Sequence, residues 1–209
     1  MASDISSLLV EGRPGTSAAK AARREAETAA FAEAVLRGLA HRPRSIPSRF
    51  LYDATGSALF EEITKLTEYY PTRTETALLE AFGDEIAALA GAVDILVEFG
   101  SGSSRKTSLL IDALPGLQTY IPIDVSEDFL VDAARRLSVQ HPGLTIRPLV
   151  GDFTHTSKLA GAPRGQKLGF FSGSTIGNLT HAEAKAFLVN AAQLPISTRP
   201  LVGLAGVST

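Results

Sequence analysis

Residues 93–107 have the sequence Val93-Asp-Ile-Leu-Val-Glu-Phe-Gly-Ser-Gly-Ser-Ser-Arg-Lys-Thr107. An apolar run ends at the acid Glu98, and a glycine-rich turn and helix-forming residues from Ser104 to Ala113 follow it. The apolar run predicts a buried parallel β-strand. Gly100 and Gly102 let the backbone bend sharply and approach a ligand without a Cβ in the way. The stretch therefore predicts a nucleotide-like ligand beside this turn.

Strand and helix patterns alternate on both sides of this stretch. Further strands are predicted at residues 119–125, 144–150, 167–171 and 201–207, and helices at 16–40, 72–89, 126–139 and 180–193. Ser126 is expected to cap one helix, and Thr180 with Glu183 forms a capping box for another. The helix at 72–89 is expected to bury an apolar face made of Ala77, Leu78, Ala81, Phe82 and Ile86. This alternation predicts an α/β fold with a doubly wound parallel sheet and right-handed crossovers.

Length and composition indicate one α/β domain with an N-terminal helical extension. The chain has 209 residues, of which 44% are apolar, enough for one sizeable core. We expect a mobile tail at 1–15, an N-terminal helical region at 16–90 that contributes to the substrate site, and the ligand-binding α/β domain at 91–209.

Charge and residue types exclude several functions. A net charge of −2 with interspersed signs predicts no nucleic-acid or membrane partner, so we expect a small-molecule ligand. The chain has no cysteine, and its four histidines lack ligand spacing, so no metal site is expected. No segment is typical of a membrane span or a secretory signal, which predicts a cytoplasmic location. Oligomeric state does not follow from the sequence.

Candidate ligand-binding residues follow successive predicted strands. Gly100 follows the first strand, Asp124 ends the second, Asp152 and Phe153 follow the third, and Asn178 follows the fourth. Parallel strands end at one edge of a sheet, where doubly wound folds bind ligands. An acid at the end of the second strand can accept hydrogen bonds from a ribose diol. Asp152 is placed to meet an adenine amino group, and Phe153 offers an apolar face to the ring.

Each of these residues also has a purely structural interpretation. The glycines could serve only a tight turn, and either aspartate could be a loop or capping residue. Asn178 could belong to a turn, and Tyr69 could be a packing residue with its hydroxyl at the surface. A Walker A loop is a rival interpretation of residues 100–107, but Arg105 occupies the position of that motif's last glycine. The sequence therefore favours a nucleoside ligand over a triphosphate.

Several motifs together resemble the L-histidine Nα-methyltransferases of ergothioneine biosynthesis. They are Ser48-Arg-Phe-Leu-Tyr-Asp53, Phe60-Glu-Glu-Ile-Thr64, Glu68-Tyr-Tyr-Pro-Thr-Arg-Thr-Glu75, Glu98-Phe-Gly-Ser-Gly-Ser-Ser-Arg-Lys-Thr107, Tyr120-Ile-Pro-Ile-Asp-Val-Ser126, Gly151-Asp-Phe153 and the segment from Phe170 to Asn178. The resemblance covers residues 42 to 192. It implies a class I methyltransferase (Rossmann-like) sheet, S-adenosyl-L-methionine as cofactor and L-histidine as the small-molecule substrate.

The resemblance also implies roles for individual residues. Gly100 and Lys106 would hold the methionine part of the cofactor, and Lys106 would bind the carboxylate of that part. Asp124 would bind the ribose, and Asp152 with Phe153 the adenine. The substrate contacts would be Tyr69 and Asn178. The implied chemistry is in-line displacement at the sulfonium methyl by the neutral α-amine, which needs positioning but no dedicated catalytic nucleophile.

The chain departs from the family at two places. Ser172 stands where the family usually has proline, and the resemblance fades after Ala192. We therefore expect a truncated chain whose sheet is incomplete at its C-terminal end, with an unpaired edge and uncovered apolar faces. The alternative to methyl transfer is a non-catalytic remnant or paralogue that retains at most partial S-adenosylmethionine binding.

Overall fold

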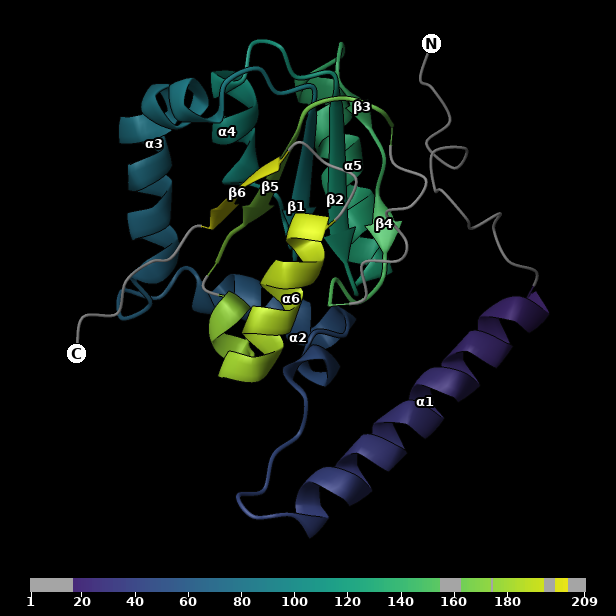
Figure 1. The fold of residues 1–209 in the computed structure, drawn as a ribbon. Helices are drawn as coiled ribbons and strands as arrows, with labels where there is room; N and C mark the ends of the chain where they lie inside the picture. The colour runs from purple at the N-terminus through teal and green to yellow at the C-terminus, as the bar shows by residue number, and fades with distance from the viewer. Residues whose placement is uncertain (1–16, 155–162, 174, 194–197, 203–209) are drawn as a thin grey trace.

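A parallel sheet lies between a layer of helices on one face and a single described helix on the other in the computed structural model, which describes residues 17–154, 163–173, 175–193 and 198–202 (Figure 1). The strand order is β3-β2-β1-β5-β6, and β4 also pairs with β2. The strands are β1 (Ile95–Phe99), β2 (Thr119–Asp124), β3 (Thr145–Ile146), β4 (Leu149–Val150), β5 (Lys167–Phe171) and β6 (Thr198–Val202). The helices are α1 (Ser17–Ala40), α2 (Ala54–Ile63), α3 (Pro71–Ala90), α4 (Thr107–Ala113), α5 (Glu127–Gln140) and α6 (His181–Gln193), with 3-10 turns η2 (Ser48–Leu51) and η4 (Thr175–Asn178).

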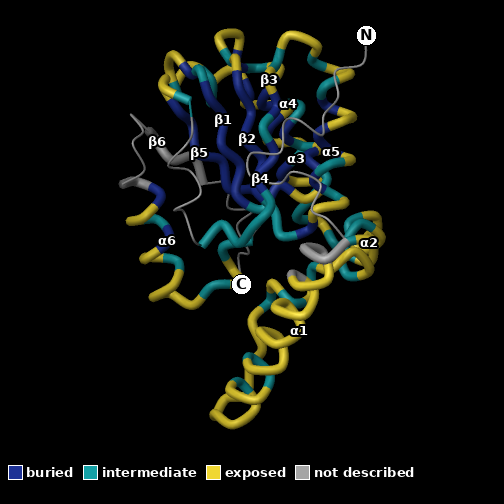
Figure 2. Tube along the Cα trace, turned by 90° about the vertical axis from the view of Figure 1, so that its right-hand side faces the viewer, coloured by how far each residue is buried: buried dark blue, intermediate teal, exposed yellow. Residues whose placement is uncertain are grey.

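Side-chain alternation along the strands produces two cores, one on each face of the sheet. Leu96 and Tyr120 face the layer of α3, α4 and α5, and they pack with Leu110 of α4. Val97 faces the other side, where Phe187 of α6 covers the sheet. Figure 2 shows the buried strands between α6 on one side and α3, α4 and α5 on the other. The predicted doubly wound parallel sheet is therefore confirmed, with the strand order of dinucleotide-binding folds.

Two predicted strands have different bounds in the structure. The strand expected at residues 144–150 is split into β3 and β4, which lie on either side of Arg147 and Pro148. Proline has no N–H for the ladder, so it interrupts the pairing there. The last strand begins at Thr198 rather than Leu201, and β6 pairs in parallel with β5 along its whole length. Residues 203–207 of the expected strand lie outside the described residues.

The helix after the glycine turn begins later than predicted. α4 starts at Thr107, and Ser104 has a φ of +52°, outside the helical region. The Ser104 hydroxyl forms a 3.0 Å hydrogen bond with the Tyr120 hydroxyl, which fixes this conformation. The turn therefore extends to Lys106. Ser126 does lie at the start of α5, but its side chain makes no capping hydrogen bond.

The buried face of α3 also differs from the expected one. Leu78 and Phe82 are 44% and 45% exposed, whereas Glu75, Leu79 and Gly83 are buried. Gly83 allows a close approach to α4, because a Cβ at this position would lie 3.3 Å from the Ala113 Cβ. Helix α3 thus faces the α/β domain with Glu75, Leu79 and Gly83, and Ile86 is the residue of the expected face that packs against the core.

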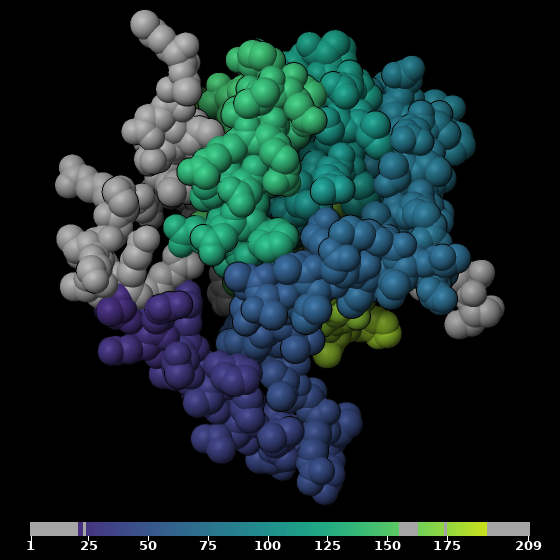
Figure 3. Space-filling view, turned by 180° about the vertical axis from the view of Figure 1, so that it is seen from behind, coloured from purple at the N-terminus to yellow at the C-terminus, as the bar shows by residue number. Residues whose placement is uncertain are grey.

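Helix α1 extends away from the sheet (Figure 1), and in the space-filling view from behind it lies at the lower left of the molecule (Figure 3). Its Leu36 is 75% exposed, and the Phe31 ring meets the Phe50 ring of η2 edge-on, with centroids 5.2 Å apart. This helix therefore does not cover the core. Among the described helices, none is long and apolar enough to cross a membrane. The tail predicted at residues 1–15 lies outside the described residues.

Candidate functional site

The glycine turn between β1 and α4 is tied to the end of β2. The Gly100 and Ser101 N–H groups both donate to the Ile123 carbonyl oxygen, at 2.9 and 3.1 Å. Gly100 has a φ of +73° and Gly102 of +51°, a region in which glycine has no steric penalty. The place of a Cβ on Gly100 lies 3.5 Å from the Phe153 ring, so the turn and the loop after β4 lie side by side, and the positive φ is what requires glycine here.

Asp124 ends β2 beside this turn. One carboxylate oxygen accepts the Gly102 N–H and the other the Ser126 N–H, each at 2.9 Å. Each carboxylate oxygen has two lone pairs, so both retain capacity for a further donor such as a ribose hydroxyl. The side chain is half-buried at the carboxyl edge. Asp124 thus organises the turn and remains suitable for the predicted ribose contact.

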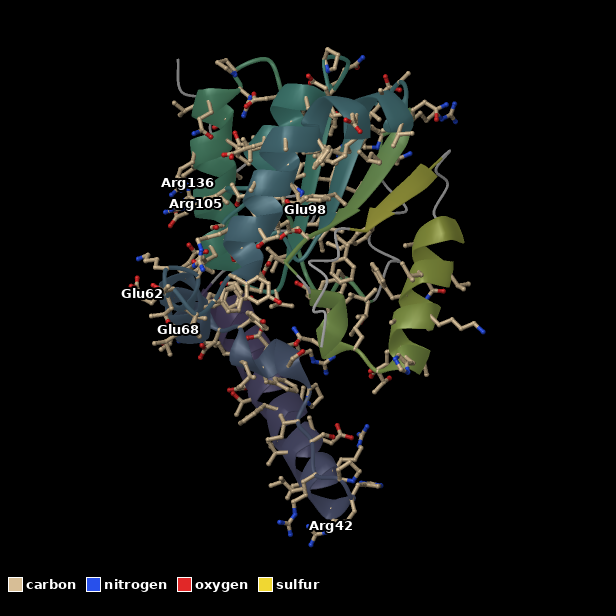
Figure 4. All side chains as sticks on the ribbon, turned by 90° about the vertical axis from the view of Figure 1, so that its left-hand side faces the viewer. Arg42, Glu62, Glu68, Glu98, Arg105 and Arg136 are labelled. Carbon is tan, nitrogen blue, oxygen red and sulfur yellow. The ribbon has the colours of Figure 1, made fainter. Side chains whose placement is uncertain are left out.

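Glu98 lies directly beneath the turn, in the interior between the sheet and the helices (Figure 4). It is 1% exposed, and its carboxylate accepts hydrogen bonds from the hydroxyls of Thr107 (2.8 Å), Ser172 (3.1 Å) and Tyr120. Burial raises the pKa of Glu98 to about 7, although these hydrogen bonds and the nearby Lys106 oppose the rise. The same burial, with the Glu98 charge, raises the pKa of Tyr120. Three separate segments therefore meet on one buried acid.

Lys106 ends the turn and forms an ion pair with Glu75 of α3. The lysine and glutamate side chains are only 18% and 7% exposed. Glu75 also accepts the Gly173 N–H with both oxygens, at 3.0 and 3.1 Å, in the turn that follows β5. Arg105, the neighbour of Lys106, is exposed at the surface near Arg136 (Figure 4). Lys106 therefore lies between α3 and the β5 turn.

Asp152 and Phe153 follow β4 at the same edge. The Asp152 carboxylate accepts hydrogen bonds from Arg49 of η2 at 2.9 Å and from the Thr154 N–H and hydroxyl at 2.9 and 2.6 Å. Burial alone would raise the pKa of Asp152, but the hydrogen bonds from Thr154 and Arg49 lower it. Phe153 packs edge-on against Phe171, with ring centroids 5.2 Å apart. An ionised acceptor and an aromatic ring are thus placed together next to Gly100.

The two predicted substrate residues belong to different elements. The Tyr69 ring packs edge-on to Phe60 with centroids 5.8 Å apart, and it belongs to the N-terminal helical region. Burial and the nearby Tyr52 and Glu75 raise the pKa of Tyr69, so its hydroxyl keeps its proton. Asn178 ends η4 and is exposed. Tyr69 lies close enough to Glu75 for the carboxylate charge to act on its hydroxyl, and Asn178 lies in the turn that follows β5.

A family model described as "Histidine-specific methyltransferase, SAM-dependent" matches residues 31–207. The chain belongs to this family. The match extends beyond Ala192, so the expected loss of resemblance after that residue is wrong. Within the matched residues, β6 pairs in parallel with β5. The fold of this family member is thus the class I methyltransferase sheet that the motifs predicted.

Named relatives agree with the family match. The chain is 45% identical over 82% of its length to the histidine N-alpha-methyltransferase of Mycolicibacterium smegmatis, and covers 51% of that protein. It is 43% identical over 74% of its length to the protein of the same name from Mycobacterium tuberculosis, and covers 48% of it. It is 33% identical over 70% of its length to the ergothioneine biosynthesis protein 1 of Neurospora crassa, covering 17%. The chain therefore spans about half the length of the two bacterial relatives.

The residues at the carboxyl edge fit the cofactor named in the family description. The Ser101 hydroxyl is buried in the glycine turn without a hydrogen-bond partner among the described residues. A Cβ on Gly173 would lie 3.6 Å from the Lys106 ammonium nitrogen, so the missing side chain keeps a space beside that cation. An acid, an ammonium group and an aromatic ring surround this turn. The methyltransferase family member thus has the donors and acceptors that a nucleoside with an amino-acid tail requires.

Sequence reasoning did not assign roles to Glu75, Arg49 or Glu98, although all three lie within the quoted motifs. Glu75 could have been found from helical spacing, because it shares a stripe with Leu79 and Gly83 and a lone acid on a buried stripe needs a partner. Glu98 stands within the apolar strand, which indicates a buried carboxylate. The Arg49 pair joins residues 103 positions apart, and no local pattern indicates it.

Proposed function

We propose that this chain binds S-adenosyl-L-methionine at the carboxyl edge of its sheet and transfers the methyl group to the α-amino group of L-histidine. The observation that carries the proposal is that residues predicted from separate motifs lie at or after the carboxyl ends of β1, β2 and β4 in one parallel sheet: Gly100, Lys106, Asp124, Asp152 and Phe153. The relatives named histidine N-alpha-methyltransferase support histidine as the acceptor. The cytoplasmic location and the absence of a nucleic-acid partner remain part of this proposal.

The cofactor supplies an electrophilic methyl group on a sulfonium when it is bound. Lys106 would hold the carboxylate of the methionine part, and Asp124 the ribose diol through its remaining lone pairs. Asp152 would accept a hydrogen bond from the adenine amino group beside the Phe153 ring. Tyr69 and Asn178 would orient the histidine so that its neutral amine faces the methyl group. Positioning of this kind can supply most of the catalysis in a direct displacement.

Calorimetric titration with S-adenosylhomocysteine, with and without L-histidine, tests the cofactor site. We expect binding by the wild-type chain and a loss of about tenfold or more in Asp124→Asn, because a ribose acceptor is weakened. Asp128→Asn on the exposed start of α5 is the matched control and should bind as the wild type does. A folded wild-type chain that binds nothing under either condition would overturn the cofactor assignment.

Turnover separates methyl transfer from binding alone. Mass spectrometry of histidine incubated with the chain and S-adenosylmethionine should show a mass increase of the amino acid that depends on Tyr69 and Asn178. Cofactor binding without any methylated histidine would instead support the binding-only alternative for this chain.

A further inference from the structure

Glu75 is a buried acid that the proposed chemistry has not yet used. It is 5% exposed, although it lies on a helix of the N-terminal region rather than on the sheet. An ionised carboxylate is costly to bury unless it is paired and hydrogen-bonded. Glu75 has both kinds of partner, since Lys106 provides the opposite charge and Gly173 an N–H group. The structure therefore maintains a fixed negative charge at the position where the glycine turn meets the turn after β5.

The position of this charge relative to the cofactor follows from Lys106. In the proposed function, which this inference rests on, Lys106 binds the carboxylate of the cofactor's methionine part. An ammonium group has three N–H donors, so Lys106 can keep its bond to Glu75 and still donate to a ligand carboxylate. Once that carboxylate compensates the lysine, the negative charge of Glu75 is no longer cancelled. It then acts on the remaining charges of the methionine part.

Cofactor and product differ in those charges. S-adenosylmethionine carries a sulfonium, whereas S-adenosylhomocysteine carries a neutral thioether, and both have the same carboxylate, ammonium, ribose and adenine. Hydrogen bonds to the shared groups cannot distinguish the two ligands. A fixed anion near the methionine part does, because it attracts the ligand with the additional positive charge. We propose that Glu75 positions Lys106 and gives the site its preference for the cationic cofactor over the neutral product.

The preference has a functional consequence. Product that binds as tightly as the cofactor occupies the site after each methyl transfer and slows the next one. A carboxylate that favours the sulfonium form weakens binding of the product relative to binding of the cofactor, and it leaves the contacts to adenosine unchanged. Glu75 would thus promote exchange of product for new cofactor, from a helix that belongs to the substrate side of the molecule.

The test compares two dissociation constants in the same variant. Calorimetric titrations with S-adenosylmethionine and S-adenosylhomocysteine are made in the presence of Nα,Nα,Nα-trimethylhistidine, which has no free amine to methylate. Glu75→Gln keeps an acceptor oxygen for Gly173 and Lys106 but removes the charge. We expect the preference for S-adenosylmethionine to fall by about three- to tenfold, the effect of one unit charge about 3 to 6 Å away when water screens it fully. Glu80→Gln, on the exposed side of the same helix, should leave the preference unchanged.

The outcomes separate this inference from the proposed function. A wild-type chain that binds neither ligand overturns both. A wild-type chain that binds both, with equal losses for the two ligands in Glu75→Gln, overturns the inference alone and leaves Glu75 a structural role. Should Glu75→Gln not fold, Glu75→Asp provides the second measurement, because it keeps the charge and shortens the side chain. The preference of Glu75→Asp for S-adenosylmethionine over S-adenosylhomocysteine should match that of the wild type. Loss of this preference in Glu75→Asp would refute the role of charge.

Discussion

Glu98 shows how a single residue can connect the strands to the ligand edge. Its carboxylate accepts hydrogen bonds from Thr107 at the start of α4, from Tyr120 in β2 and from Ser172 after β5. Each donor comes from a different element, so the acid fixes their relative positions under the glycine turn. Ser172 contributes one of these hydrogen bonds through its hydroxyl and so ties the turn after β5 to the same acid.

The buried acid makes stability depend on pH. Burial raises the pKa of Glu98 to about 7, from an ordinary value of 4.5. The folded state therefore holds the proton more tightly than the unfolded state. Proton binding by Glu98 thus contributes at most about 3 kcal/mol to the free energy of unfolding. This contribution is fully present below about pH 4.5 and is lost as the pH rises through 7. We expect the melting temperature of the wild type to fall between pH 5.5 and 8 relative to that of Glu98→Gln. Parallel curves for the two proteins would contradict the assignment.

The residues predicted from the sequence are those in which a local pattern carries the information. Asp124 ends an apolar strand and Gly100 begins a turn, so position along the chain indicated their place in the sheet. Glu75 and Arg49 acquire their partners, Lys106 and Asp152, only when the N-terminal region meets the sheet edge. Contacts between segments far apart in sequence have no such local signal. Whether the predicted residues bind their assigned ligands stays a prediction.

At the scale of elements, the sequence predicted which helices and strands form better than it predicted their faces and ends. Periodicity alone suggested that Leu78 and Phe82 would be buried, yet the ion pair of Glu75 and the small Gly83 turn another face of α3 towards the α/β domain. Pro148 divides one predicted strand because it cannot donate to the ladder. Tertiary contacts thus overrode the helical pattern, and backbone chemistry overrode the strand pattern.

The capping box at the start of α6 is one local prediction that the structure confirms. The Glu183 carboxylate accepts the Thr180 N–H at 2.8 Å, and the Thr180 hydroxyl accepts the Glu183 N–H at 3.3 Å. Hydrogen bonds from Thr180 lower the pKa of Glu183. We expect Thr180→Ala to lower the free energy of unfolding by about 1 kcal/mol, and Thr180→Ser to lower it much less. Urea denaturation of both variants checks this, and equal losses would show that the hydroxyl is not the cause.

At the scale of the whole molecule, the parallel sheet carries the stability and α1 contributes little. Phe171 is 3% exposed in the core beneath α6, whereas Leu36 of α1 is 75% exposed. We expect a chain that begins at residue 41 to melt within about 4 °C of the full chain, because little apolar area is lost with α1. Phe171→Ala should lower the melting temperature far more, since large core truncations cost about 3–5 kcal/mol. Thermal unfolding of the two proteins measures both melting temperatures. A larger fall in melting temperature for the chain without α1 than for Phe171→Ala would contradict this account.

The close contact between α3 and α4 offers a way to fix one part of the molecule to another. A Cβ on Gly83 would lie 3.3 Å from that of Ala113, slightly below the usual separation across a disulfide. The chain has no cysteine of its own, so cysteines at these two positions would have no competing thiol within the polypeptide. Oxidation and reduction would then lock and release α3 against the layer that carries Lys106. The same protein sample could thus be compared with α3 fastened and free.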